Sequence, residues 1–421
     1  MSKTFQISFL ILFICLFSSS FVFFTAPFEF YFHYIIIVLL FPILLFRIGI
    51  PKFYLFIFLI PLAVGLVHII LKNNHPFTFV KIFGGLSVTL LFFYYLIVYN
   101  KFNLFDLFKI YCKCCWILVI ISLIQIFSYF IGFKFGYHYS WFLNKWGFVE
   151  GGIIGFRVNS ILSEPTYLAT SLSPAVYVSI NNLLSKKKLI FKNYQSILII
   201  IVIILTTSTV GYLGILFSIL LISKTIRLRY IVIGLIISFF GFTLAYNNVK
   251  DFKSRVDAAK GLWFENDFRI QNTNNSSFVL YNNLHIAKEN LLKHPLFGTG
   301  LGSHETAFNR FTLTKSLIQY DFEFNIKDGN SLFIRLCSET GILGLSFIIL
   351  IIIKGFIYRV DDQNDLLLNR KIISQSIFVL LILVLIRQGN YMLNGLPLLF
   401  LLYYYNGVQY KNELINLNTD D

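Results

Sequence analysis

The sequence predicts an all-α integral membrane protein with about 12 transmembrane helices and one large extracytoplasmic loop. Hydrophobic residues occupy 57% of the 421 positions and charged residues only 13%, whereas a soluble chain carries about 25% charged residues. Apolar runs recur that are long enough to cross a bilayer as helices, which need about 20 residues. Helices are expected there because a membrane-spanning backbone must satisfy its own hydrogen bonds.

The apolar runs place the expected spans along the chain. The break at Thr206–Thr209 separates two short runs, so this pair is assigned as two spans with a tight turn. The expected spans are 5–24, 29–46, 53–71, 82–99, 112–131, 165–184, 196–206, 209–223, 230–247, 341–358, 372–388 and 393–406.

The distribution of positive charge predicts the orientation. Lysine and arginine in short loops favour the cytoplasm. With a cytoplasmic N-terminus, every segment expected inside carries basic residues, and these segments hold most of the 35 lysines and arginines. Both termini are therefore expected in the cytoplasm. The net charge of +15 follows this pattern, so we interpret it as a topology signal and expect no nucleic-acid partner.

These spans divide the chain into three parts. Residues 1–247 are expected to hold helices 1–9, residues 248–340 the large extracytoplasmic loop, and residues 341–421 helices 10–12 with a cytoplasmic tail. The loop is nearly neutral, and Tyr281–Leu292 within it has the pattern of a short amphipathic helix. A second outside segment, 132–164, is also long enough to carry functional residues.

Arg157 and Glu164 lie at the expected outer mouth of the sixth helix, where Pro165 suits the first helical position. Glu164 would then lie near the positive end of the helix dipole. One interpretation is a functional pair. The alternative is a helix cap and an interfacial arginine.

Two further segments bring polar groups or glycines to the membrane surface. Gly298, Gly300 and Gly302 alternate in a stretch whose backbone amides are candidates for phosphate binding, or which is simply a turn. The segment from Asp328 to Gly344 contains Asn330, Arg335 and Glu339 and leads into the next helix. Asn330 is equally suited to cap that helix.

The loop arginines are candidates for phosphate binding, because guanidinium forms bidentate bonds with phosphate oxygens and stays charged. Arg255, Arg269 and Arg310 lie in this loop. Each could equally be an ordinary surface residue. No cluster has convincing metal-ligand spacing, so neither a metal nor a cofactor is expected.

In order along the chain, these segments resemble the O-antigen polymerase and ligase superfamily of bacterial cell-envelope enzymes. The family pattern has about a dozen helices, an Arg…Glu-Pro segment before a middle helix and a large periplasmic loop. That loop carries Pro-Leu-Phe-Gly-x-Gly-x-Gly and closes on Glu-x-Gly-x-x-Gly. This chain shows the corresponding residues in order: Arg157 with Glu164-Pro165, Pro295–Gly302, and Glu339-Thr-Gly-Ile-Leu-Gly344.

The resemblance implies a glycosyltransferase that uses an undecaprenyl-diphosphate-linked oligosaccharide in the bacterial cytoplasmic membrane. Polymerases of this superfamily transfer the growing chain onto the next lipid-linked repeat unit, for O-antigen, capsule or exopolysaccharide. Ligases transfer it to a lipid or protein acceptor. Besides the lipid bilayer, a flippase and a chain-length regulator are partners that such an activity implies.

Two departures favour the polymerase. Ligases of the superfamily usually carry His-Asn nine residues before the loop-closing glutamate, where this chain has Asn330-Ser331. They also tend to carry Ser-Arg-Gly near the turn that reads Ser208-Thr-Val-Gly211 here. His304 remains a candidate for the missing histidine.

The resemblance and the chemistry together suggest roles for individual residues. A diphosphate leaving group needs cations, and the acceptor hydroxyl needs a base. The expected catalytic residues are Glu339, Asp328, His304 and Glu164. The expected diphosphate- or substrate-binding residues are Arg157, Arg255, Arg269, Asn330, Gly298, Gly300 and Gly302.

Two other classes of function compete with this one. A flippase for lipid-linked oligosaccharides also has about 12 spans, but transporters tend to place ionisable residues at mid-membrane and to show repeat symmetry. This chain has almost no charge within its apolar runs and one lopsided loop. A receptor or assembly protein that binds through the loop is the other alternative.

Overall fold

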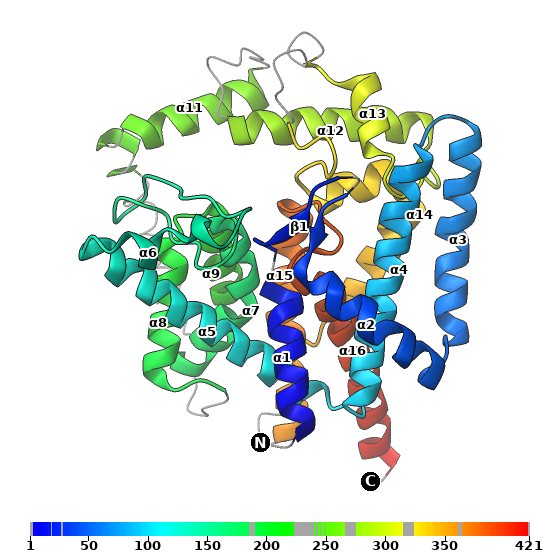
Figure 1. Ribbon diagram of the computed structural model, residues 1–421, viewed down its shortest axis with the longest axis horizontal. Coiled ribbons are helices and arrows are strands. Elements are labelled where there is room, and N and C mark those ends of the chain that lie inside the picture. The colour runs from blue at the N-terminus through cyan, green and yellow to red at the C-terminus, as the bar shows by residue number, and fades with distance from the viewer. Residues whose placement is uncertain are drawn as a thin grey trace.

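The computed structural model is a helical bundle with a layer of helices across one end (Figure 1). It describes all residues except 1–2, 18, 27, 185–189, 223–239, 241–242, 245, 249, 266–274, 315–323, 361–363 and 420–421. The bundle contains α1 (Lys3–Phe17), α2 (Phe32–Ile48), α3 (Lys52–Ile70), α4 (Pro76–Tyr99), α5 (Leu104–Phe130), α7 (Pro165–Leu184), α8 (Asn193–Leu205), α9 (Thr209–Ile222), α14 (Leu332–Gly355), α15 (Asp365–Ile386) and α16 (Leu396–Thr419).

The expectation of an all-α membrane protein is confirmed. Among the described residues, five helices are long and apolar enough to cross a membrane: α3, α4, α5, α14 and α15. Helices α1, α2, α8 and α9 are apolar but shorter. The expected count of 12 spans is therefore not established, and most of the expected span 230–247 lies outside the described residues.

The first expected span is wrong in its extent. Helix α1 ends at Phe17, and the chain then forms a small antiparallel hairpin of β1 (Val22–Phe24) and β2 (Phe30–Tyr31). The physical reason is aromatic packing: the Phe24 and Phe30 rings stack with centroids 4.9 Å apart. An apolar run alone does not distinguish this hairpin from the end of a helix.

Helix α7 lies at the centre of the bundle and packs against α8, α9 and α15. It begins at Pro165, as expected. Small residues such as Ala169, Ser173 and Ala175 are fully buried along it. Small side chains let helices approach closely in a membrane, and their hydroxyls bond to nearby backbone, as Ser173 Oγ does to the Thr170 carbonyl at 2.8 Å.

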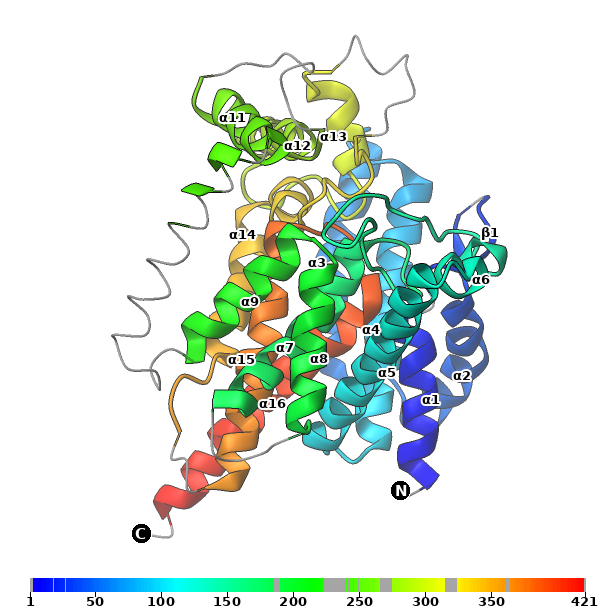
Figure 2. The same ribbon diagram turned by 90° about the vertical axis from the view of Figure 1, so that its left-hand side faces the viewer.

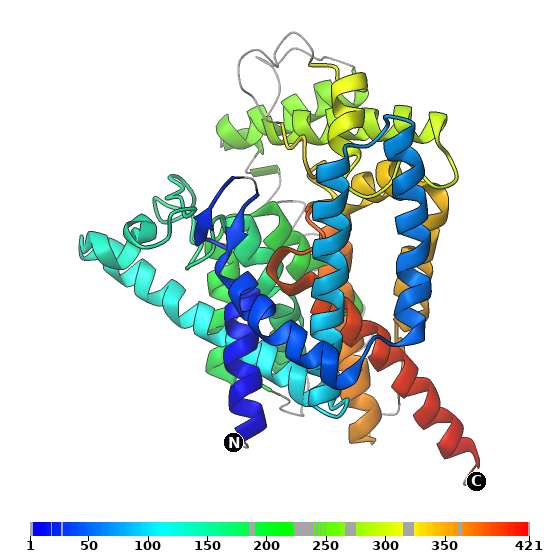
Figure 3. The same ribbon diagram turned by 45° about the vertical axis from the view of Figure 1, so that its right-hand side comes forward.

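The large loop forms the layer at one end of the bundle, opposite both chain termini (Figure 2). It contains α11 (Lys250–Phe264), α12 (Asn275–Lys293) and α13 (His304–Phe311). Helix α12 confirms the amphipathic helix expected at Tyr281–Leu292. Figure 3 shows the adjoining ends of α3 and α4 beside this layer.

Helix α14 begins at Leu332 and so crosses the boundary expected at residue 340. It is kinked at Gly341, whose backbone is non-helical (φ 62°, ψ −163°). The kink exists because the chain from Pro295 to Gly302 packs directly against it. The Ile342 amide donates to the Pro295 carbonyl at 2.8 Å, and the Gly300 amide donates to the Glu339 carbonyl at 2.8 Å.

Glycine is required at this contact. Gly298 has φ +65°, and a β-carbon added there would lie 2.6 Å from the backbone carbon of Glu339. Side chains avoid both that backbone conformation and that distance. The glycine-rich stretch therefore joins the loop layer to α14 by close backbone packing.

We expect Gly298→Ala to lower the thermal midpoint of the purified protein, because the new methyl group must displace backbone at a strained φ, at a cost of about 2 kcal/mol. Gly84→Ala on α4 is the matched control, since an added β-carbon there meets nothing within 4 Å. Equal midpoints for the two variants, measured by thermal unfolding in the same detergent, would contradict the packing role.

Candidate functional site

A cavity of about 480 Å³ opens where the N-terminal hairpin, the segment before α7 and the segment before α16 meet. This volume is sufficient for a small-molecule group. Its walls include acidic, basic and aromatic side chains. The lining residues are Ser19, Tyr31, Asn144, Lys145, Trp146, Gly147, Val149, Ser163, Glu164, Tyr167, Asn390 and Leu393.

Glu164 is the acidic residue that lines this cavity, directly before the first turn of α7. The pKa of its carboxyl is raised, because the surrounding protein reduces its hydration and because the negative charge of Asp328 lies nearby. Arg157, Arg387 and Lys145 oppose this shift. A carboxylate that is accessible from a cavity and has a raised pKa is suited to accept a proton from a substrate hydroxyl.

Lys145 supplies a positive charge on the cavity wall. Its ammonium group lies 2.6 Å from Glu29 Oε2 and 3.1 Å from the Tyr31 hydroxyl, and Tyr31 also donates a hydrogen bond to Glu29. The segment carrying Lys145 is fastened to the hairpin, because the Asn144 side chain bonds to both the amide and the carbonyl of Val22. The hairpin therefore forms one wall of the site.

Two arginines lie close enough to Glu164 to favour its charged form. Arg157 Nε donates to the Thr206 carbonyl at 3.2 Å, which ties this side chain to the turn between α8 and α9. Arg387, at the end of α15, donates to the Ser276 carbonyl at 3.2 Å. Burial lowers the pKa of Arg387, while Glu164 and Asp328 raise it.

Asp328 and Asn330 lie beside this group rather than on the cavity wall. The Asn330 amide donates to Asp328 Oδ1 at 3.0 Å, and Asn330 has φ 59°. Ser331 caps α14 by accepting from the Ile334 amide at 3.3 Å, so the capping role considered for Asn330 belongs to its neighbour. Asp328 acts on Glu164 through its charge.

The position of Glu339 differs from the position expected of a catalytic base. It is fully buried, its Oε1 accepts from Arg335 Nε at 2.9 Å, and its Oε2 accepts from the Tyr391 hydroxyl at 2.9 Å. Glu339 does not line the cavity. With both oxygens engaged in the interior, it is not available to activate a substrate, so this geometry favours a structural role.

The three loop glycines, which were expected to bind phosphate through their amides, lie in close contact with other parts of the backbone. The Gly298 amide donates to the His294 carbonyl at 3.2 Å, and the Gly300 amide donates to Glu339. An added β-carbon at Gly302 would lie 3.0 Å from the Thr78 carbonyl oxygen. These glycines permit close packing, and two of their amides are already committed to protein acceptors.

The other expected arginines are Arg255, Arg269 and Arg310. Arg255 lies on α11, and Arg269 lies outside the described residues. Arg310 ties α13 to the turn after α3, donating to the Asn73 side chain and to the Lys72 carbonyl, both at 2.6 Å. Of the expected arginines, Arg157 is the one that the structure places beside Glu164.

Sequence reasoning missed Lys145, Tyr31 and Arg387 as site residues. Lys145 lies in the segment 132–164, which was expected outside, and Arg387 lies near the outer end of the expected span 372–388; the orientation rule predicts few basic residues on that side. That exception was the available signal. Tyr31 was assigned to a membrane span, so nothing in the sequence marked it.

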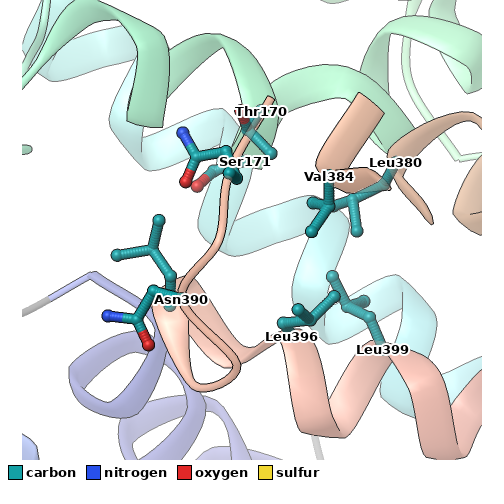
Figure 4. A pocket seen from close by; sticks show the side chains of 9 residues that line it. Thr170, Ser171, Leu380, Val384, Asn390, Leu396 and Leu399 are labelled. Atoms are coloured by element: carbon teal, nitrogen blue, oxygen red, sulfur yellow. The ribbon is translucent and has the colours of Figure 1, made fainter. Parts of the chain in front are cut away.

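A second, internal crevice of about 10 Å³ continues from the cavity into the bundle, and the two share Asn390 and Leu393. Leu380 and Val384 of α15 face Leu396 and Leu399 of α16 across it (Figure 4). Its volume is close to that of one water molecule, about 10–15 Å³ by this measure. Thr170, Ser171, Gln388 and Asn390 contribute polar groups to the same crevice.

His304 lies in the interior of the loop layer. It is fully buried, and its Nε2 lies 3.0 Å from Asn283 Oδ1. Within the described structure its Nδ1 has no hydrogen-bond partner. Burial, assisted by the positive charge of Arg335, lowers its pKa to about 3. A buried, neutral imidazole packed beside Gly329 is a structural element.

This lowered pKa predicts a pH-dependent stability. The ordinary pKa of histidine is 6.5. Below that pH the unfolded chain binds a proton at His304 and the folded protein does not, so the free energy of unfolding decreases. The contribution lost between pH 7 and pH 5 is about 2 kcal/mol. We expect His304→Asn to flatten the fall of the thermal midpoint over this range. Identical pH dependence in both proteins would argue against a buried neutral histidine.

Comparison with known families is consistent with the motif order along the chain. Residues 195–349 match the family model described as O-antigen ligase. No curated protein matches this chain. The matched region begins in α8, includes the loop layer and ends in α14, beyond the kink at Gly341. Glu164 and Arg387 lie outside it. The match at residues 195–349 supports the expected resemblance to the O-antigen polymerase and ligase superfamily, and with it glycan transfer in general.

Proposed function

We propose that the protein is a polymerase that transfers a growing glycan from undecaprenyl diphosphate onto the next lipid-linked repeat unit. The observation that carries this proposal is the cavity in which Glu164 lies near Lys145, Arg157 and Arg387. One base surrounded by cations is the combination that glycosyl transfer from a diphosphate requires. The family match at residues 195–349 supports glycan transfer in general.

The topology that we propose retains 12 spans, cytoplasmic termini and an extracytoplasmic loop at 248–340. The positions of the termini support it, because both lie at the end of the bundle opposite the loop layer (Figure 2). The cavity is lined by Glu164, which lies at the expected outer mouth of α7. A polyprenyl diphosphate in the outer leaflet of a bacterial cytoplasmic membrane would reach the cavity from that side. A flippase and a chain-length regulator would be partners in supplying the donor and limiting the product.

The proposed reaction is a single displacement at the anomeric carbon of the donor sugar. The acceptor hydroxyl oxygen attacks that carbon, and its proton passes to the Glu164 carboxylate. The bond from the anomeric carbon to the diphosphate oxygen breaks, and the diphosphate leaves with the electron pair. Arg157 and Arg387 balance the charge that develops on this leaving group, and Lys145 binds sugar or phosphate oxygens on the opposite wall.

A ligase that transfers the glycan to a lipid or protein acceptor is the second candidate. The description of the matched family favours it. The sequence Asn330-Ser331, in place of His-Asn, supports the polymerase. The position of His304 supports it as well, because a fully buried imidazole bonded to Asn283 does not replace a histidine in the cavity.

Glu164 provides a direct test of the proposed chemistry. We expect Glu164→Gln to lower the transfer rate at least ~100-fold in proteoliposomes, the usual size of a lost general base. In the wild-type protein the rate should rise with pH along an acidic limb centred above 4.5, the ordinary glutamate value, because only the ionised carboxylate accepts the proton.

Glu150→Gln is the matched control, since Glu150 is an exposed carboxylate in the same outer segment and does not line the cavity. It should keep both the rate and the pH profile of the wild type. Full activity of Glu164→Gln at normal expression would exclude Glu164 as the base.

Deletion of the gene separates polymerase from ligase. If the protein polymerises, a ladder gel of the surface glycan should show a single repeat unit still attached to its acceptor. That pattern arises because attachment survives the loss of polymerisation. Long polymer accumulating on the polyprenyl lipid, with none on its acceptor, would instead identify a ligase. Complementation with the intact gene is the control.

A further inference from the structure

The segment 387–391, which joins α15 to α16, borders the candidate site without belonging to a helix. It carries Arg387, whose charge acts on Glu164, and Asn390, which lines both the cavity and the crevice (Figure 4). A connection of this kind has many accessible conformations. Something must therefore hold it where Arg387 and Asn390 meet the site.

A buried polar network holds this segment from behind. Arg335 Nη1 donates to the Gly389 carbonyl at 2.8 Å, and the Tyr391 hydroxyl donates to Glu339. The Arg335 guanidinium also lies over the Tyr391 ring, 4.2 Å from its centre. Arg335 and Glu339, one turn apart on α14 and only 3% and 0% exposed, pair with each other at 2.9 Å.

Close packing completes the attachment. A β-carbon at Gly389 would lie 1.6 Å from the Asp328 carbonyl oxygen, so the two segments are in direct backbone contact. Ser331 Oγ donates to the Leu385 carbonyl at 2.6 Å on the same side. The chain around Asp328 and the segment 387–391 therefore form one joined unit beside Glu164.

A buried ion pair is a poor means of gaining stability, because removing two charges from water costs as much as their attraction returns. In some proteins such a pair instead fixes a single conformation of the chain around it. Arg335 and Glu339 do not line the cavity. The paired side chains hold the segment by hydrogen bonds at two points on either side of Asn390, the Gly389 carbonyl and the Tyr391 hydroxyl.

We propose that Arg335 and Glu339 are positioning residues that act through Gly389 and Tyr391 to hold Arg387 and Asn390 at the site. This inference rests on the proposed glycan transfer for its effect on activity. The arrangement itself does not depend on that function. Loss of the pair should displace the segment, weaken donor binding and leave the bundle folded.

The Arg370–Glu413 pair offers a matched control. It joins the same two helices, α15 and α16, away from the cavity, with Arg370 Nη2 2.7 Å from Glu413 Oε1. Glu413→Gln should therefore disturb the packing of these helices without touching the segment 387–391. Glu339→Gln breaks the network behind the site. Tyr391→Phe removes one hydrogen bond of that network. It is the alternative test variant if Glu339→Gln does not fold.

The first readout is independent of catalysis. Asn390→Cys, in a background without the five native cysteines, reports the position of the segment through its labelling rate with a membrane-impermeant maleimide in vesicles. We expect Glu339→Gln and Tyr391→Phe to change this rate at least ~5-fold and Glu413→Gln to leave it unchanged. Equal rates in all the variants would overturn the proposal.

The second readout is the kinetics of transfer from an undecaprenyl-diphosphate-linked repeat unit. We expect Glu339→Gln to raise the donor KM at least ~10-fold and Tyr391→Phe to raise it less, with Glu413→Gln near wild type at a matched thermal midpoint. Equal kinetic losses in Glu339→Gln and Glu413→Gln would mean a general loss of stability and would overturn positioning. If Glu339→Gln shifts the labelling rate but the wild-type protein shows no transfer, positioning would be supported and the proposed function refuted.

Discussion

The contact between the glycine-rich stretch and the kink of α14 is the constraint on which the outer half of the molecule depends. Gly298 and Gly341 bring the two backbones together, and amides of each segment donate to carbonyls of the other. This contact joins the loop layer to the bundle. It also sets the direction of the first turns of α14, from which Arg335 and Glu339 project into the interior.

From that point a chain of contacts leads to the candidate site. The Arg335–Glu339 pair holds the segment 387–391, and that segment carries Arg387 toward Glu164 and Asp328. On the other side, the hairpin holds Lys145 through Glu29. A single cavity carboxylate is thus surrounded by cations from two distant parts of the chain, the segment before α7 and the end of α15. Their balance with Asp328 determines how readily Glu164 takes a proton.

The sequence predicted much of the fold. The helical membrane class, the start of α7 at Pro165 and the amphipathic α12 follow from apolar run length, proline position and helical periodicity. The N-terminal hairpin was missed because aromatic residues are equally apolar in a strand and in a helix. The number of spans is not established by helix length, since α8 and α9 have 13 and 14 residues.

Composition and motif order by themselves predicted a membrane protein, a family resemblance and the two segments that contain the candidate site residues. Both are local properties of the chain. Tertiary structure alone decided which polar residues meet: it placed Glu164 at a cavity, brought Lys145 and Arg387 near it, and buried Glu339 and His304 elsewhere. The physical reason is that burial and electrostatic neighbourhood depend on contacts between residues up to a few hundred positions apart. No local pattern encodes those contacts.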